Sequence, residues 1–146
     1  MPDGSTLDRA TMRLLIVARH CPPAVSGGAM RPYLFARELI ALGHEVRIVA
    51  PNVCPGVPTV VVPHHHVDPA IGTGGIENPW RTWARRWMLP DPDIRWALRA
   101  ARAVEGIALD WVISTSPPES SHVAGWLLKR RFRCRWLADF RDHWFA

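Results

Sequence analysis

The chain has 146 residues, of which 48% are hydrophobic and 21% are charged, and its formal net charge is +5. This composition is typical of one globular domain and excludes a disordered chain or a disulfide mini-protein. The longest apolar runs fall far short of the roughly 18 residues that a membrane span needs, which excludes a transmembrane protein. The excess of basic residues favours anionic partners: nucleotide phosphates, nucleic acid or acidic lipid headgroups.

The cysteines and the amino terminus indicate where the protein resides. Cys21, Cys54 and Cys134 are odd in number and widely spaced, with no C-x-x-C pair. We therefore expect no disulfide framework and a reducing, cytoplasmic location. Residues 1–11 are polar and aperiodic, which predicts a disordered leader, and they lack the basic and apolar regions of a secretory signal.

The first half of the chain alternates apolar runs with one amphipathic segment. Residues 12–18 form a nearly continuous apolar run, which is typical of a strand buried on both faces of a parallel sheet. Pro32 suits the first turn of the helix that follows, and Gly43 suits the position just after its end. The elements predicted here are strands at 12–18, 45–50 and 59–62 and a helix at 31–42.

Residues 64–93 interrupt this pattern, and we interpret them as a long excursion with one short helix. Loops of this length inside a domain are usually functional. Regular structure resumes at Asp93, a candidate N-cap, and the S-x-x-E pattern of Ser116 to Glu119 predicts a capping box. The elements predicted here are a helix from 93 to the stop at Gly106, a strand at 110–115, a helix to about 131 and a strand at 135–140.

Strands that alternate with helices predict an α/β fold: a Rossmann-like, mostly parallel five-stranded sheet with helices on both faces, formed by one domain over 12–146. Ligands of such folds bind beyond the carboxyl ends of the strands. Gly27 and Gly28 follow the first strand, where they either let backbone N–H groups approach a phosphate or form a simple turn. Asp139, Arg141 and Asp142 follow the last strand, where they either bind substrate hydroxyls or form a structural ion-pair network.

Three adjacent histidines, residues 64–66, are the only pattern that suggests a metal. Neighbouring side chains of an extended chain point to opposite sides, so the three histidines do not readily bind one ion. No Cys or carboxylate is spaced to complete such a site. We expect no metal site.

The excursion also carries an aromatic and basic segment. Trp80, Trp83 and Trp87 are spaced to share one helical face, and Arg81 and Arg86 lie between them. This segment fits contact with a membrane interface, stacking on nucleic-acid bases, or a packing stripe with a solvated basic edge. The sequence alone leaves these three alternatives open.

Several short motifs occur in a fixed order along the chain. They are M-R-L-L-I-V-A-R at the first strand, then P-P and G-G, L-G-H-E-V, S-T-S-P-P with S-H, and A-D-F-R-D-H-W at the last strand. From residue 12 to the end of the chain, this series resembles the N-terminal, acceptor-side domain of GT-B glycosyltransferases of the family 4 type. The nearest subgroup is the one with a D-F-R-D-x-W motif.

The resemblance implies transfer of a sugar from a nucleotide-sugar donor to a saccharide or lipid-linked acceptor, as in cell-envelope polysaccharide synthesis, without a metal or cofactor. It implies that Gly27 and Gly28 lie beside the donor diphosphate. Many relatives have a histidine at the site where this chain has Arg141, so Asp139, Arg141 and Asp142 are candidates for orienting substrate rather than assigned catalysts. The other implied contacts are Ser116, Glu119, His122 and His143 on the substrate side, and Trp80, Arg81, Trp83, Arg86 and Trp87 toward the acceptor or the inner face of the membrane.

The donor-binding C-terminal domain of that family has no counterpart in this sequence. We therefore expect a truncated or split enzyme that binds nucleotide sugar weakly and is inactive without a second domain. The alternative is a non-catalytic basic α/β module that binds an anionic ligand or a partner subunit. Nucleic-acid binding is not expected, because no helix-turn-helix, RRM or zinc signature occurs.

Overall fold

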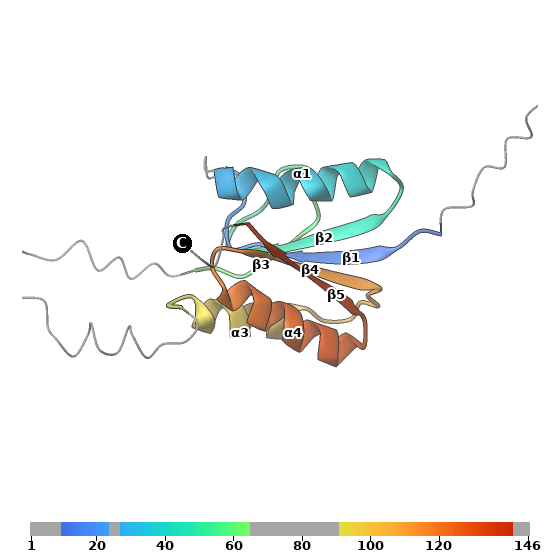
Figure 1. Cartoon of the computed structure of the whole chain (residues 1–146). Coiled ribbons are helices and arrows are strands. Elements are labelled where there is room, and N and C mark those ends of the chain that lie inside the picture. The colour runs from blue at the N-terminus through green and yellow to red at the C-terminus, as the bar shows by residue number, and fades with distance from the viewer. Residues whose placement is uncertain (1–9, 24–26, 65–90, 142–146) are drawn as a thin grey trace, which may run out of the picture.

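The computed structural model describes residues 10–23, 27–64 and 91–141, and these form one five-stranded sheet with helices on both faces (Figure 1). All four strand pairs are parallel, and the strand order is β3-β2-β1-β4-β5. The predicted Rossmann-like α/β arrangement is confirmed. The strands are β1 (Arg13–Val17), β2 (Glu45–Ala50), β3 (Thr59–Val61), β4 (Trp111–Ser116) and β5 (Arg135–Phe140).

The helices form two layers. Helix α1 (Gly27–Ala41) covers one face of the sheet, whereas α3 (Ile94–Ala103) and α4 (Ser120–Phe132) lie together on the other (Figure 1). Helix α1 begins one turn before its predicted start, and Pro32 lies inside it, because the burial of Ala29 extends the helix. None of the helices in the described ranges is long and apolar enough to cross a membrane. The short helix predicted within 64–93, and most of the predicted leader, lie outside the described residues.

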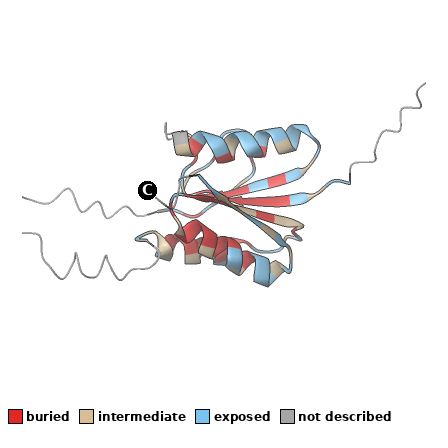
Figure 2. Cartoon of the chain, in the orientation of Figure 1, coloured by how far each residue is buried: buried red, intermediate tan, exposed pale blue. Residues whose placement is uncertain are grey.

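The core consists of two apolar clusters, one on each side of the sheet (Figure 2). Strand β1 supplies both, because successive side chains of a strand point to opposite faces. Leu15 packs with Trp96 of α3 and Leu128 of α4 on one side, and Ile16 packs with Ala36 of α1 on the other. The continuous apolar run of β1 is therefore explained by burial on both faces.

The start of α4 differs from the prediction. Ser116 is the last residue of β4 and not a helix cap, and Glu119, which precedes the helix, makes no side-chain capping hydrogen bond. The cap comes from Asp91 instead, whose Oδ2 accepts a hydrogen bond from the backbone N–H of Ser120 at 2.6 Å. The capping-box prediction is wrong because a carboxylate 29 positions earlier in the chain satisfies this backbone group.

The cysteines also differ from the prediction. Cys21 in the loop after β1 and Cys54 in the loop after β2 form a disulfide, and both are buried. The expectation that no disulfide forms is wrong for this pair. Parallel pairing of β1 with β2 brings the two loops to one edge of the sheet, so residues 33 positions apart meet there.

Gly125 lies where α4 crosses the sheet, and it provides a test of this packing. A Cβ atom there would lie 2.8 Å from Ser114 Oγ and would also crowd the indole of Trp136. In an open helix Gly→Ala stabilises by up to about 1 kcal/mol. Here we expect Gly125→Ala to lower the free energy of unfolding by about 1–3 kcal/mol in urea denaturation followed by tryptophan fluorescence.

The control is Lys129→Ala on the exposed side of the same helix, which should change stability by less than about 0.5 kcal/mol. A Gly125→Ala protein as stable as the wild type would show that α4 does not pack against Ser114 and Trp136 as described.

Asp110 anchors the starts of β1 and β4 and predicts a pH dependence of stability. Its carboxylate accepts hydrogen bonds from the Arg13 guanidinium at 2.9 and 3.1 Å and from the Arg13 backbone N–H at 2.8 Å. These bonds lower the pKa of Asp110 to about 2. Because an unfolded aspartate titrates near pH 4, the carboxylate stabilises the fold above that pH and less as the pH falls toward 2. We expect Asp110→Asn to be less stable than wild type at pH 6, and the difference to vanish near pH 2, in urea denaturation at each pH.

Candidate functional site

The parallel sheet places the ends of all its strands at one edge, which we call the carboxyl edge. The strand order reverses between β1 and β4, since the chain continues from β1 outward to β2 and later returns to β4. Ligands of open α/β sheets bind at such a point. The loops that follow β1, β4 and β5 meet there.

Four residues at this edge form a charged group that we call the edge cluster: Gly28, Arg31, Asp139 and Arg141. A Cβ atom on Gly28 would lie 3.2 Å from Cζ of Arg141, so the guanidinium rests directly against the first turn of α1. One turn further along α1, Arg31 Nη2 donates to Asp139 Oδ1 at 2.9 Å. A side chain at this position would force the flexible end of the Arg141 side chain to move.

Asp139 is the most informative member of the edge cluster. Its side chain is only 12% exposed, and its second oxygen, Oδ2, has no hydrogen-bond partner among the described residues. A buried carboxylate oxygen without a donor is costly, so this atom is suited to accept a hydrogen bond from a ligand hydroxyl. The adjacent guanidinium groups and the N-terminus of α1 favour an anion such as phosphate. The cluster can therefore bind a molecule that carries both groups.

A second set of contacts surrounds His122 on the other side of the sheet. The Trp136 indole N–H donates to Ser114 Oγ at 2.9 Å, and Ser114 Oγ lies 2.8 Å from His122 Nδ1. Because an indole N–H can only donate, the Ser114 hydroxyl oxygen accepts from Trp136, and the Ser114 hydroxyl proton is available for His122 Nδ1. The neutral His122 ring then carries its proton on Nε2.

Burial keeps His122 in this neutral form. Desolvation lowers the pKa of His122, against the opposing effect of the negative charges of Glu119 and Asp139. The centroid of the His122 ring lies 4.2 Å from the centroid of the Phe140 ring. The Nε2 atom of His122 is buried without a hydrogen-bond partner in the described part of the chain. His122 is thus a neutral hydrogen-bond donor near the carboxyl edge.

A third group of charged side chains, not predicted from the sequence, lies at the same edge. Asp93 Oδ1 accepts from Arg19 Nε at 3.2 Å and from His64 Nε2 at 2.6 Å. Asp93 occupies the predicted N-cap position of α3, but its carboxylate makes no capping hydrogen bond and instead contacts these two partners from the ends of β1 and β3. Partial burial lowers the pKa of His20, and the positive charges of Arg19 and Arg141 lower it further. This group therefore borders the edge cluster.

The predicted site residues are thus partly brought together. Gly28, Asp139 and Arg141 belong to the edge cluster, and Gly27 begins the same helix. Ser116 is buried beside Phe140 at the end of β4, and Glu119 acts on His122 through its charge. The predicted residues that lie outside the described part of the chain are Trp80, Arg81, Trp83, Arg86, Trp87, Asp142 and His143.

Two further observations concern alternative sites. The described residues contain no group of three or more His, Cys, Asp or Glu side chains arranged to hold a metal ion, and two of the three adjacent histidines lie outside those residues.

A cavity of about 650 Å³ lies at the opposite, amino edge of the sheet, where its lining includes Arg13, Glu45 and Thr59. The carboxyl edge is therefore identified by its chemistry and not by a cavity.

Comparison with known proteins adds no family: no protein-family model matches the chain, and no curated protein is significantly similar to it. The fold is that of an α/β protein with a Rossmann-like parallel sheet. The similarity to family 4 glycosyltransferases stays a prediction, which depends on the motifs quoted above.

The buried neutral state of His122 links folding to pH. Because the pKa of His122 is lower in the folded protein than in the unfolded chain, the unfolded chain binds protons first as the pH falls below about 6.5. We expect the wild type to lose more stability between pH 7.5 and pH 5 than His122→Gln does, in urea denaturation at each pH. The other titrating groups are common to both proteins and cancel in this comparison. Equal losses would mean that His122 titrates alike in both states.

Proposed function

We propose that the chain is the N-terminal, acceptor-side domain of a GT-B glycosyltransferase, which transfers a sugar from a nucleotide-sugar donor to a saccharide or lipid-linked acceptor. The observation that carries this proposal is the edge cluster, in which the Arg141 guanidinium rests on Gly28, and Asp139, bonded to Arg31 through Oδ1, has a buried Oδ2 without a hydrogen-bond partner among the described residues. A nucleotide sugar presents the matching groups, a diphosphate next to sugar hydroxyls.

In this proposal each member of the edge cluster has a separate role. Arg141 and the N-terminus of α1 bind the diphosphate and compensate its charge as it leaves the sugar. Asp139 Oδ2 accepts a hydrogen bond from a hydroxyl, and Arg31 is a positioning residue that holds the carboxylate through Oδ1. A second domain supplies the rest of the donor site, so this chain binds nucleotide sugar weakly and does not turn it over alone.

The test is titration calorimetry with a panel of common nucleotide sugars, the matching nucleoside diphosphates and inorganic pyrophosphate. We expect Arg141→Ala to weaken binding of every diphosphate by about tenfold, since a hydrogen bond to a charged group contributes about 1.5–3 kcal/mol. Asp139→Ala should weaken binding of nucleotide sugar more than that of pyrophosphate. The control is Arg37→Ala on the exposed side of α1, which should bind like wild type.

Two results would contradict the proposal. Equal affinity for pyrophosphate and for every nucleotide sugar would instead favour the non-catalytic anion-binding module. Efficient donor hydrolysis or transfer by this chain alone would refute the need for a second domain.

A further inference from the structure

The positive charge of the protein is concentrated on one helical layer. Helices α3 and α4 contain six Lys and Arg residues and no acidic residue. The whole chain has 18 Lys and Arg against 13 Asp and Glu, so the 12 basic residues outside these helices are outnumbered by the acidic ones. The net charge of +5 therefore comes from this layer alone.

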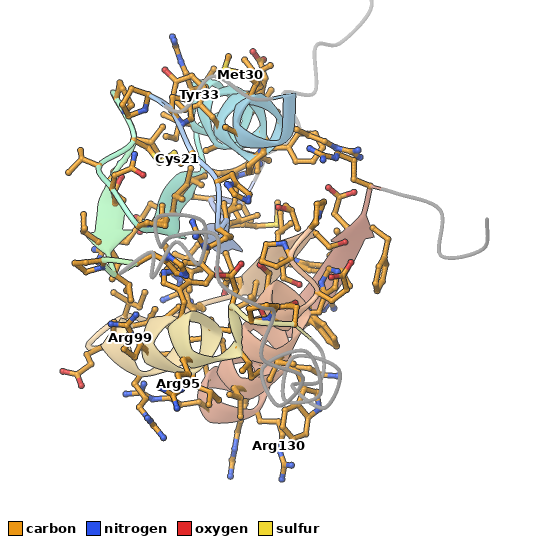
Figure 3. All side chains as sticks on the ribbon, turned by 90° about the vertical axis from the view of Figure 1, so that its left-hand side faces the viewer. Cys21, Met30, Tyr33, Arg95, Arg99 and Arg130 are labelled. Carbon is orange, nitrogen blue, oxygen red and sulfur yellow. A yellow bond between two sulfur atoms is a disulfide. The ribbon has the colours of Figure 1, made fainter. Side chains whose placement is uncertain are left out.

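The basic side chains of this layer share one outer face. Arg95, Arg99 and Arg102 follow each other at i, i+4 and i+7 along α3 and are all exposed. In Figure 3, Arg95, Arg99 and Arg130 all extend from the same side of the molecule, away from the sheet. The two helices are joined by Arg131, whose Nη1 donates to the carbonyl oxygen of Ala101 at 3.2 Å. We call the exposed residues of this surface the basic face: Arg95, Arg99, Arg102, Trp126, Lys129 and Arg130.

The basic face makes no ion pair with the described part of the fold. No ion pair among the described residues includes a member of the basic face. The buried side of α3 is apolar, with Trp96 and Ala100 in the core, and the arginines lie on its opposite, exposed side. Like charges held near each other repel, and an anionic surface relieves that repulsion. The one aromatic member, Trp126, is 43% exposed and lies beneath the Arg130 guanidinium at 4.9 Å from Cζ to the ring centroid.

We propose that the basic face binds the surface of a membrane that contains anionic lipids. Clusters of four to eight Lys and Arg residues are typical of such binding, which is the sum of many weak attractions to the lipid headgroups. An exposed Trp beside them suits the headgroup region, where its ring is half buried and its N–H stays hydrated. Single-stranded nucleic acid is favoured by a row of aromatic rings in a groove, whereas this face is the outer surface of two packed helices with one ring.

This placement has a consequence for the carboxyl edge. Both helices begin at that edge, where Asp91 joins the start of α3 to the start of α4. With the basic face on a membrane, the two helices lie along the surface, and the start of α1, which carries Gly28 and Arg31 of the edge cluster, lies across the sheet from it (Figure 1). Membrane binding by the basic face does not depend on the proposed function.

The experiment is co-sedimentation of the full chain with vesicles of phosphatidylcholine, alone or mixed with phosphatidylglycerol, and without any nucleotide sugar. We expect binding only to the mixed vesicles, and less of it as salt is added. Arg95→Glu/Arg99→Glu should weaken binding by at least about tenfold. The matched control is Arg37→Glu/Arg47→Glu, which makes the same change of net charge at exposed sites of α1 and β2 and should bind like wild type. Circular dichroism checks folding, and Arg95→Ala/Arg99→Ala replaces the first variant if that variant does not fold.

Three outcomes would overturn the proposal. They are equal binding to neutral vesicles, equal losses in the two charge-reversed proteins, and a loss confined to single-stranded oligonucleotide binding in the α3 variant. The last of these would assign the face to nucleic acid. Because no donor is present in the assay, failure of the glycosyltransferase proposal would leave these results unchanged.

Discussion

Strand β1 pairs in parallel with β2 on one side and with β4 on the other, and this pairing determines where the other elements lie. Leu15, Ile16 and Val17 of β1 are completely buried. A shift of one residue in either pairing would turn their side chains to the wrong face, so the register is strongly specified. Since the pairing is parallel, the chain leaves every strand at the same edge. The disulfide of Cys21 and Cys54 and all the charged contacts of the carboxyl edge follow from that geometry.

Charged residues have two different roles in this protein, according to their exposure to water. At the carboxyl edge two arginines are matched to carboxylates, Arg31 to Asp139 and Arg19 to Asp93, because an unpaired charge in a partly buried site is costly. On the outer side of α3 and α4 the arginines are hydrated and need no partner within the fold. The first arrangement suits recognition of one small ligand, and the second suits attraction to an extended surface.

The local pattern predicted the described strands to within one or two residues, because burial of a strand shows directly as an apolar run. It also indicated Gly28, Asp139 and Arg141, since residues that follow parallel strands collect at one edge. It failed for Ser116 as a helix cap, and although it placed Asp93 correctly at the N-cap position of α3, it did not predict the partners of the Asp93 carboxylate. Ser116 is held in β4, and the carboxylate of Asp93 is occupied by Arg19 and His64. Propensity describes a residue and its neighbours, whereas these outcomes depend on partners from elsewhere in the chain.

Hydrophobic periodicity and turn residues act over short distances, so the sequence sufficed to predict the order of the elements, the parallel sheet and the edge at which we propose that a ligand binds. Which side chains meet at that edge depends on the folded arrangement of the whole chain. Arg31 and Asp139 are 108 positions apart, and no local pattern connects them. The tertiary structure also decided that the basic residues of two separate helices form one face, since α3 and α4 must bury their apolar sides against the same side of the sheet.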